Sequence, residues 1–181
     1  MSDTVLLVGC GNMGRAMLEG WLAAKPSLNA YVVEPAEALR DRAAALGATV
    51  VGAAGDLPSG LSPDLIFLAV KPQVMPSVLP DYAAFTASTF VSVAAGTTVT
   101  TLRAGLGAEA AVIRCMPNTP AAIGAGMMVC WGTDNVTDAA KARMEQEQLR
   151  LLYVAMTRAE SRLIVCGPHV GRVNAALKPG C

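Results

Sequence analysis

Three glycines near the N-terminus have a spacing that suits the binding of a phosphate group. They form a G-x-G-x-x-G pattern made by Gly9, Gly11 and Gly14. The pattern directly follows Thr4–Val8, an apolar run typical of a β-strand. In such a pattern the first glycine permits a tight turn, the second lets the main chain approach a pyrophosphate, and the third lets a helix pack closely on the strand. A helix beginning near Asn12 would direct its free N–H groups and positive dipole end at the phosphates.

An acidic residue stands where a dinucleotide-binding fold contacts the adenosine ribose. Glu34 follows Gly14 by 20 residues and comes directly after a second strand-like run, Asn29–Val33. This is the spacing of the ribose-binding acid. Two interpretations stay open, a ribose contact or a surface glutamate. An acid favours a free 2′-hydroxyl and therefore NAD, but Arg40 and Arg42 are close enough in sequence to compensate, so the preference between NAD and NADP also stays open.

Short runs rich in Val, Ile and Leu alternate with Ala-rich segments of helical character. Strands are expected at Thr4–Val8, Asn29–Val33, Thr49–Val51, Asp64–Ala69, Thr89–Val93, Ala111–Cys115 and Met127–Trp131. Helices are expected at Asn12–Ala24, Ala36–Leu46 and Thr98–Leu106. Continuous apolar strands separated by helices indicate an α/β fold whose largely parallel sheet carries helices on both faces. We therefore predict a doubly wound, Rossmann-like NAD(P)-binding domain over residues 1–142.

Three further loops follow expected strands, at the edge where open α/β sheets bind their ligands. Each loop is small, polar or contains Gly or Pro, which suits close approach of the main chain to a flat cofactor. The loops are Ala69-Val70-Lys71-Pro72, Ala94-Ala95-Gly96-Thr97 and Cys115-Met116-Pro117-Asn118-Thr119-Pro120. Any one of them is ordinary for an α/β connection, but the three together with the glycine pattern favour a cofactor site.

Composition excludes several classes of function. The formal net charge at pH 7 is zero, and no stretch concentrates Lys and Arg with interleaved aromatic residues, which argues against nucleic acid or an anionic membrane as the main partner. No apolar run approaches the ~18 residues that span a bilayer. The five cysteines contain no C-x-x-C pair and His169 is the only histidine. We therefore expect no disulfide framework, no metal site, no export signal and a cytoplasmic location.

Four segments resemble, in order and spacing, those of pyrroline-5-carboxylate reductases. They are Val8–Gly14, Phe67–Gln73, Val93–Thr97 and Ile113–Pro120, within a match over about residues 4–142. The resemblance implies reduction of a small cyclic imine, 1-pyrroline-5-carboxylate, to L-proline, with NADP(H) as the favoured cofactor and NAD(H) as a possible one. The cofactor-binding residues would be Gly9, Cys10, Gly11, Asn12, Met13, Gly14, Glu34, Ala69, Val70, Lys71, Pro72, Ala94, Ala95, Gly96 and Asn118.

The implied reaction needs little acid–base machinery. The cyclic imine is readily protonated, so the protein mainly positions two rings and excludes water. No catalytic residue is assigned for this reason. Lys71 is either a proton donor or, as we favour, a lysine that lines the cofactor or supports the loop.

The C-terminal part departs from that family after about residue 143. Relatives continue into a helical domain with a Gly-Ser-Gly-Pro-Ala-type segment, through which they dimerise, and these 181 residues contain no such segment. Leu151–Gly167 instead resembles the late ATPase motif of UvrD/RecB-type helicases, with Arg158 at the γ-phosphate position. No G-x-x-x-x-G-K-[ST] accompanies it, so a helicase function is excluded. We expect a foreign tail over 143–181, joined by gene fusion, frameshift or sequence misassembly; a divergent family member is the alternative.

The tail is expected to contain secondary structure. A helix is predicted over Asp138–Ala159 and an edge strand over Arg162–Cys166. Two other functions stay open for the whole chain: a catalytically inactive dinucleotide-binding module, and another NAD(P)-dependent dehydrogenase of the 6-phosphogluconate or hydroxyisobutyrate type.

Overall fold

The computed structural model describes residues 4–117 and 128–142. Its strands are β1 (Thr4–Val8), β2 (Asn29–Val33), β3 (Thr49–Val51), β4 (Leu65–Leu68), β5 (Thr89–Ser92), β6 (Ala111–Pro117) and β7 (Met128–Gly132). Its helices are α1 (Asn12–Ala24), α2 (Glu37–Ala44), α3 (Met75–Val78) and α4 (Val99–Leu106), with single 3₁₀ turns η1 (Ala54–Asp56) and η2 (Leu79–Tyr82).

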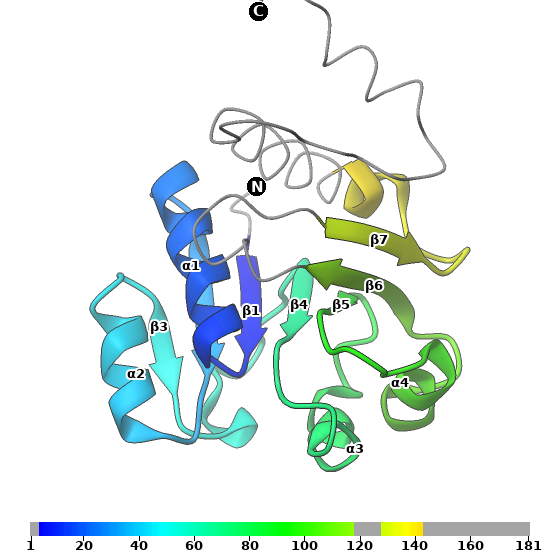
Figure 1. The fold of residues 1–181 in the computed structure, drawn as a ribbon, viewed down its shortest axis with the longest axis horizontal. Coiled ribbons are helices and arrows are strands. Elements are labelled where there is room, and N and C mark those ends of the chain that lie inside the picture. Colours follow the sequence, from blue (N-terminus) through cyan, green and yellow to red (C-terminus); the bar gives the residue numbers. More distant parts are fainter. Residues whose placement is uncertain (1–3, 118–127, 143–181) are drawn as a thin grey trace, which may run out of the picture.

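The strands form one sheet in the order β3-β2-β1-β4-β5-β6-β7 (Figure 1). All neighbouring pairs are parallel except β6 and β7, which are antiparallel. The chain runs outward from β1 to β3 and then returns to place β4 on the other side of β1. The strand order therefore reverses between β1 and β4, which is the point where doubly wound sheets bind ligands.

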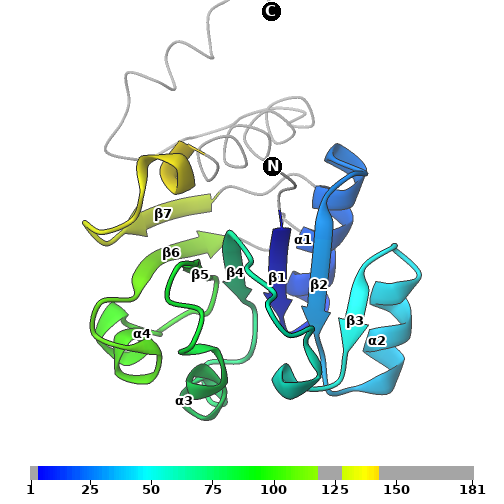
Figure 2. The same ribbon diagram turned by 180° about the vertical axis from the view of Figure 1, so that it is seen from behind.

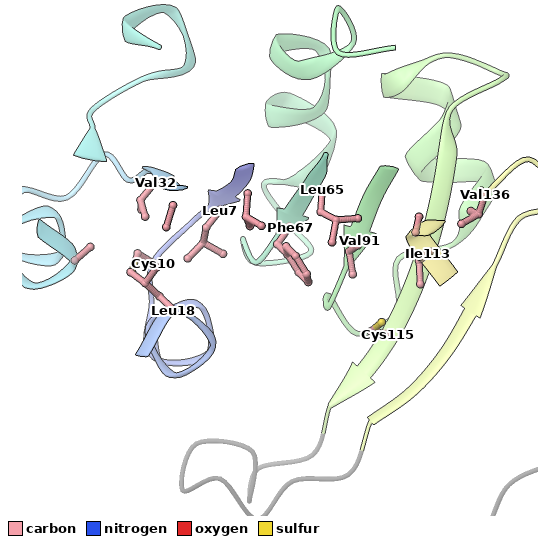
Figure 3. Packing of buried hydrophobic residues seen from close by; sticks show 14 residues of the cluster. Leu7, Cys10, Leu18, Val32, Leu65, Phe67, Val91, Ile113, Cys115 and Val136 are labelled. Atoms are coloured by element: carbon pink, nitrogen blue, oxygen red, sulfur yellow. The ribbon is translucent and has the colours of Figure 1, made fainter. Parts of the chain in front are cut away.

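The two faces of the sheet each bury an apolar core, which is why the strands read as continuous apolar runs. One core joins the strands to α1 and α2, with Leu7 and Phe67 among its members and Leu18 and Ala43 from the helices. Figure 3 shows its side chains in a row across the strands. The other core joins the strands to α3, η2 and α4 through residues such as Leu102. Along the sheet, α1 and α2 lie beside the β1–β3 half, and α3 and α4 lie beside the β4–β6 half (Figure 2).

The predicted α/β fold and its parallel sheet are confirmed, with small shifts at the ends of strands and helices. The second helix is shorter than predicted, because α2 ends at Ala44 rather than Leu46. The pattern gave no indication of α3 or η2, each a single turn with a proline as its second residue. The predicted helix Asp138–Ala159 lies largely outside the described residues, and the predicted strand Arg162–Cys166 lies wholly outside them.

One prediction about the cysteines needs correction. No disulfide was expected, yet Cys115 of β6 and Cys130 of β7 are joined by a disulfide, with their Cα atoms 4.2 Å apart. The two residues are direct partners in the antiparallel register. This proximity depends on how two strands pair, and the sequence separation of the cysteines does not reveal it. In the described part of the chain no helix is long and apolar enough to cross a bilayer.

Candidate functional site

The turn from β1 to α1 is built by contacts between main-chain segments. Gly9 has a φ of 88°, which favours glycine, and its N–H donates to the carbonyl oxygen of Val33 at 2.9 Å. A Cβ at this position would lie 2.9 Å from Cγ1 of Val70 and 3.1 Å from the carbonyl oxygen of Ala69. The loop after β1 therefore packs directly on the loop after β4, at the reversal of strand order.

The third glycine of the pattern brings α1 down onto this turn. A Cβ at Gly14 would overlap the carbonyl oxygen of Gly9 and lie 3.5 Å from Cβ of Ala69. Any side chain here would push the helix away from the turn. The close helix packing predicted for Gly14 is thus present in the structure.

The second glycine differs from the other two, because no contact within residues 4–117 and 128–142 requires a glycine there. Gly11 has φ −65° and ψ −165°, an extended conformation open to other residues. A Cβ there would meet no heavy atom of the described residues within 4 Å. Gly11 is the N-cap of α1 and has no side chain to accept from the first N–H groups of the helix. As far as the described residues go, the space beside Gly11 is therefore open. The first N–H groups of α1, at the positive end of the helix dipole, lie next to it without a side-chain cap, which suits an anionic group.

Glu34 is buried beside this turn. Only 6% of the residue is exposed, so its interpretation as a surface glutamate is wrong. Its Oε2 accepts the N–H of Cys10 at 2.7 Å, and its Oε1 accepts the N–H of Ala36 at 3.0 Å. The carboxylate thus links the glycine-rich turn to the loop that leads into α2.

The charge of Glu34 also acts on the only free cysteine of the described residues. Burial, and after it the Glu34 carboxylate, raise the pKa of the Cys10 thiol above its ordinary value of 9.0. The thiol therefore stays protonated at neutral pH and is a poor nucleophile. This agrees with a role in shaping the turn.

The two arginines considered as phosphate ligands lie in α2. Arg40 donates from Nη1 to the carbonyl oxygens of Glu34 at 3.2 Å and Pro35 at 2.6 Å. It therefore closes the loop between β2 and α2, a structural role that the sequence pattern did not reveal. Arg42 is exposed in the last turn of α2.

The loops after β4 and β5 lie beside the glycine-rich turn. The N–H of Ala69 donates to the carbonyl oxygen of Val8 at 2.8 Å, and the N–H of Val93 donates to that of Leu68 at 3.3 Å. Exposed residues of these loops, which can contact a ligand, are Lys71, Pro72, Ala95 and Gly96, whereas Ala94 is buried. The third predicted loop reaches only as far as Pro117 within the described residues, and Asn118 lies outside them.

The structure thus brings together the predicted site residues of four strand ends, those of β1, β2, β4 and β5. Their role in binding a cofactor stays a prediction. Among the described residues no cluster of His, Cys, Asp and Glu has the arrangement of a metal site.

Comparison with known proteins gives relatives over the same part of the chain. A pyrroline-5-carboxylate reductase of Escherichia coli (strain K12) is 38% identical over 135 residues, which are 70% of this chain and 48% of that protein. The chain therefore spans about half the length of this curated relative. It matches the model of a protein family over residues 4–96.

Solved structures show the same fold. A pyrroline-5-carboxylate reductase from Coxiella burnetii superposes with a TM-score of 0.74 at 22% identity and covers 84% of this chain and 57% of that one. A Plasmodium falciparum pyrroline carboxylate reductase with NADP bound has a TM-score of 0.70 at 21% identity, covering 83% of this chain and 56% of that one. Because the family model matches just over half of the residues, the chain belongs to the family described as NADP oxidoreductase, coenzyme F420-dependent.

Proposed function

We propose that this chain is the dinucleotide-binding part of a reductase that converts 1-pyrroline-5-carboxylate to L-proline with a reduced nicotinamide cofactor. The observation that carries the proposal lies at Gly11, where the strand order reverses between β1 and β4: the helix start has no side-chain cap, and no described residue fills the place of an added Cβ. The reaction is inferred from the relative in Escherichia coli, whose name, pyrroline-5-carboxylate reductase, states its activity.

The residues present fit such a cofactor. The first-turn N–H groups of α1 and the bare main chain at Gly11 suit a pyrophosphate. Glu34, buried at the end of β2, has the chemistry of a ribose partner. The loops Ala69–Pro72 and Ala94–Gly96 would line the way to the nicotinamide. When bound, the cofactor supplies a hydride to the carbon of a C=N bond.

The chain's own residues would act by binding and orientation. The turn at Gly9–Gly14 would hold the charged middle of the cofactor, and the loops after β4 and β5 would position its reactive ring and keep water away from it. We assign no proton donor, because a cyclic imine is readily protonated without a dedicated protein group. Lys71 is exposed in the loop after β4, where it would line the cofactor.

The proposal extends to the organisation of the chain. Residues 1–142 would form the cofactor domain and residues 143–181 a separate tail of helicase-like sequence that contributes no ATPase. The partner would be a small imine, with neither nucleic acid nor membrane involved. The resemblance implies dimerisation through a helical domain whose Gly-Ser-Gly-Pro-Ala-type segment these 181 residues do not contain. We also propose a cytoplasmic location. The Cys115–Cys130 disulfide would there be exposed to reducing conditions.

A binding titration followed by an assay tests the proposal. NADH and NADPH are titrated into the full chain and nicotinamide fluorescence is recorded, and then the reduction of 1-pyrroline-5-carboxylate is measured. We expect saturable binding of at least one nucleotide. If neither binds, the proposal is wrong.

A second candidate is a dinucleotide-binding module without catalysis. The specific observation in its favour is that the chain covers 48% of its reductase relative. Binding without turnover would support this candidate, and turnover would support the reductase.

A further inference from the structure

The carboxylate of Glu34 is held in place from two sides. The residue is only 6% exposed, and one amide N–H donates to each oxygen of its carboxylate, from Cys10 at 2.7 Å and from Ala36 at 3.0 Å. The main-chain N–H of Glu34 itself donates to the carbonyl oxygen of Val51 at 3.0 Å. Its position is therefore set by β2, by β3 and by the glycine-rich turn, so it cannot swing away from an incoming ligand without breaking these bonds.

We propose that Glu34 makes the dinucleotide site of this chain select a cofactor whose adenosine ribose has a free 2′-hydroxyl, NAD(H), over the 2′-phosphorylated NADP(H). This inference rests on the proposed function, since it concerns the same site. It differs from the expectation drawn from the resemblance, which favours NADP(H).

The carboxylate has the capacity to bind hydroxyl groups. An ionised carboxylate offers about four acceptor sites on its two oxygens, and the two amides of Cys10 and Ala36 occupy two of them. The remaining sites can accept O–H groups of a ribose. A phosphate ester has no such donors when it is fully ionised, and it carries a charge of about −1.5 to −2 near pH 7. It would therefore lie against a buried like charge, where water screens the repulsion poorly.

The surroundings of Glu34 offer little to offset that repulsion. The N–H of Ala36, the N-cap of α2, already donates to Glu34, so a phosphate at the start of α2 would compete for it. The first turn of that helix adds a second acid, Glu37. Nη1 of Arg40 is bound to the carbonyl oxygens of Glu34 and Pro35, and Arg42 lies in the last turn of α2, at the far end from Glu34.

The test compares the dissociation constants of NADH and NADPH for the full chain, measured by fluorescence titration or calorimetry at fixed ionic strength. We expect NADH to bind at least about tenfold more tightly than NADPH. In Glu34→Gln the preference should fall by about tenfold or more, because the repulsion of the phosphate is removed while the size of the side chain is kept. Asp41→Asn, which removes an exposed acid farther along α2, is the control and should change the ratio by less than about threefold.

The outcomes separate this inference from the proposed function. If NADPH binds the unaltered chain as tightly as NADH, the selectivity is wrong although dinucleotide binding stands. If neither nucleotide binds the unaltered chain, both proposals fail. If Glu34→Gln weakens the two nucleotides equally, Glu34 only braces the turn and the inference is overturned. If Glu34→Gln does not fold, the comparison of NADH with NADPH on the unaltered chain still tests the selectivity, and equal or tighter binding of NADPH would overturn the inference.

A last variant tests whether Arg40 compensates for Glu34. Arg40→Ala should leave the ratio of the two dissociation constants within about threefold of the unaltered chain, because Nη1 is engaged with main-chain oxygens. A selective loss of NADPH affinity in this variant would show that Arg40 serves the phosphate, and it would contradict the inference.

Discussion

The glycine-rich turn and the β6–β7 edge are held together in opposite ways. At the turn, main chain packs on main chain, and the absence of side chains at Gly9 and Gly14 is what permits the contact. At the edge, β6 and β7 pair as antiparallel strands, and side chains add links to that pairing through the Cys115–Cys130 disulfide and the buried hydroxyl of Thr133. The first arrangement tolerates no added atom, whereas the second depends on atoms that can be removed. Substitutions should therefore affect the two regions for different reasons.

The largest effect is expected for Gly14→Ala. The new Cβ would overlap the carbonyl oxygen of Gly9, and neither the turn nor the helix can move without disturbing the core, so the free energy of unfolding should fall by about 3 kcal/mol or more. Urea denaturation measures it. The matched control is Gly20→Ala in the same helix, where a Cβ meets no heavy atom of the described residues within 4 Å; it should stabilise the protein by about 0.5–1 kcal/mol. Equal effects of the two variants would contradict the tight contact at the turn.

Removal of the disulfide should cost somewhat less. The disulfide joins two cysteines that are 15 residues apart in sequence. The double variant Cys115→Ala/Cys130→Ala removes this cross-link, which should lower the free energy of unfolding by about 2–3 kcal/mol. Dithiothreitol should destabilise the unaltered chain by a similar amount and leave the double variant unchanged. If the reductant has no effect on the unaltered chain, the edge is held by strand pairing alone.

A smaller loss is expected for Thr133→Val at the same edge. The Thr133 hydroxyl accepts the N–H of Val112 at 3.1 Å in a buried position. Valine keeps the shape of the side chain but leaves that amide without this acceptor, which should cost about 1–2 kcal/mol. Thr100→Val, on the exposed surface of α4, should change the unfolding free energy by less than about 0.5 kcal/mol. Thermal or urea unfolding of both variants makes the comparison.

The smallest effect is expected in the pH dependence of stability. The free thiol of Cys10 in the turn titrates, whereas the disulfide-bonded Cys115 and Cys130 at the edge do not. Because folding raises the pKa of the Cys10 thiol above 9.0, its contribution to stability is complete below that pH and is lost as the pH rises beyond it. Unfolding free energies measured between pH 8 and pH 10 should fall, and Cys10→Ala should flatten the fall. An unchanged slope in Cys10→Ala would show that other groups cause it.

The contrast between the regions also explains what could be read from the sequence. The spacing of the glycines indicates a main-chain contact directly, so the turn at Gly9–Gly14 and the helix after it were predictable. Apolar runs report strands buried on both faces, so the parallel sheet was predictable as well. Neither glycine spacing nor apolar runs indicate strand register. The pairing of Cys115 with Cys130 was missed for that reason.

The site was predictable in outline and less so in detail. The position of Glu34 followed from its distance to Gly14, but its burial and its bond to the N–H of Cys10 depend on the packing of three strands. Arg40 has a side chain that could bind phosphate, yet its hydrogen bonds to two main-chain carbonyl oxygens depend on how the loop folds. No sequence pattern distinguishes these two uses of an arginine.

The most direct test of the account uses Gly11→Val. The structure offers open space for the new side chain among the described residues, so the variant should stay folded and lose no more than about 1 kcal/mol of unfolding free energy, the cost of a poorer N-cap residue. The branched side chain would occupy the place assigned to the pyrophosphate, so the affinity for NADH and NADPH should fall by about 100-fold or more. A folded Gly11→Val variant that binds either nucleotide as tightly as the unaltered chain would contradict the assignment of this turn as the dinucleotide site.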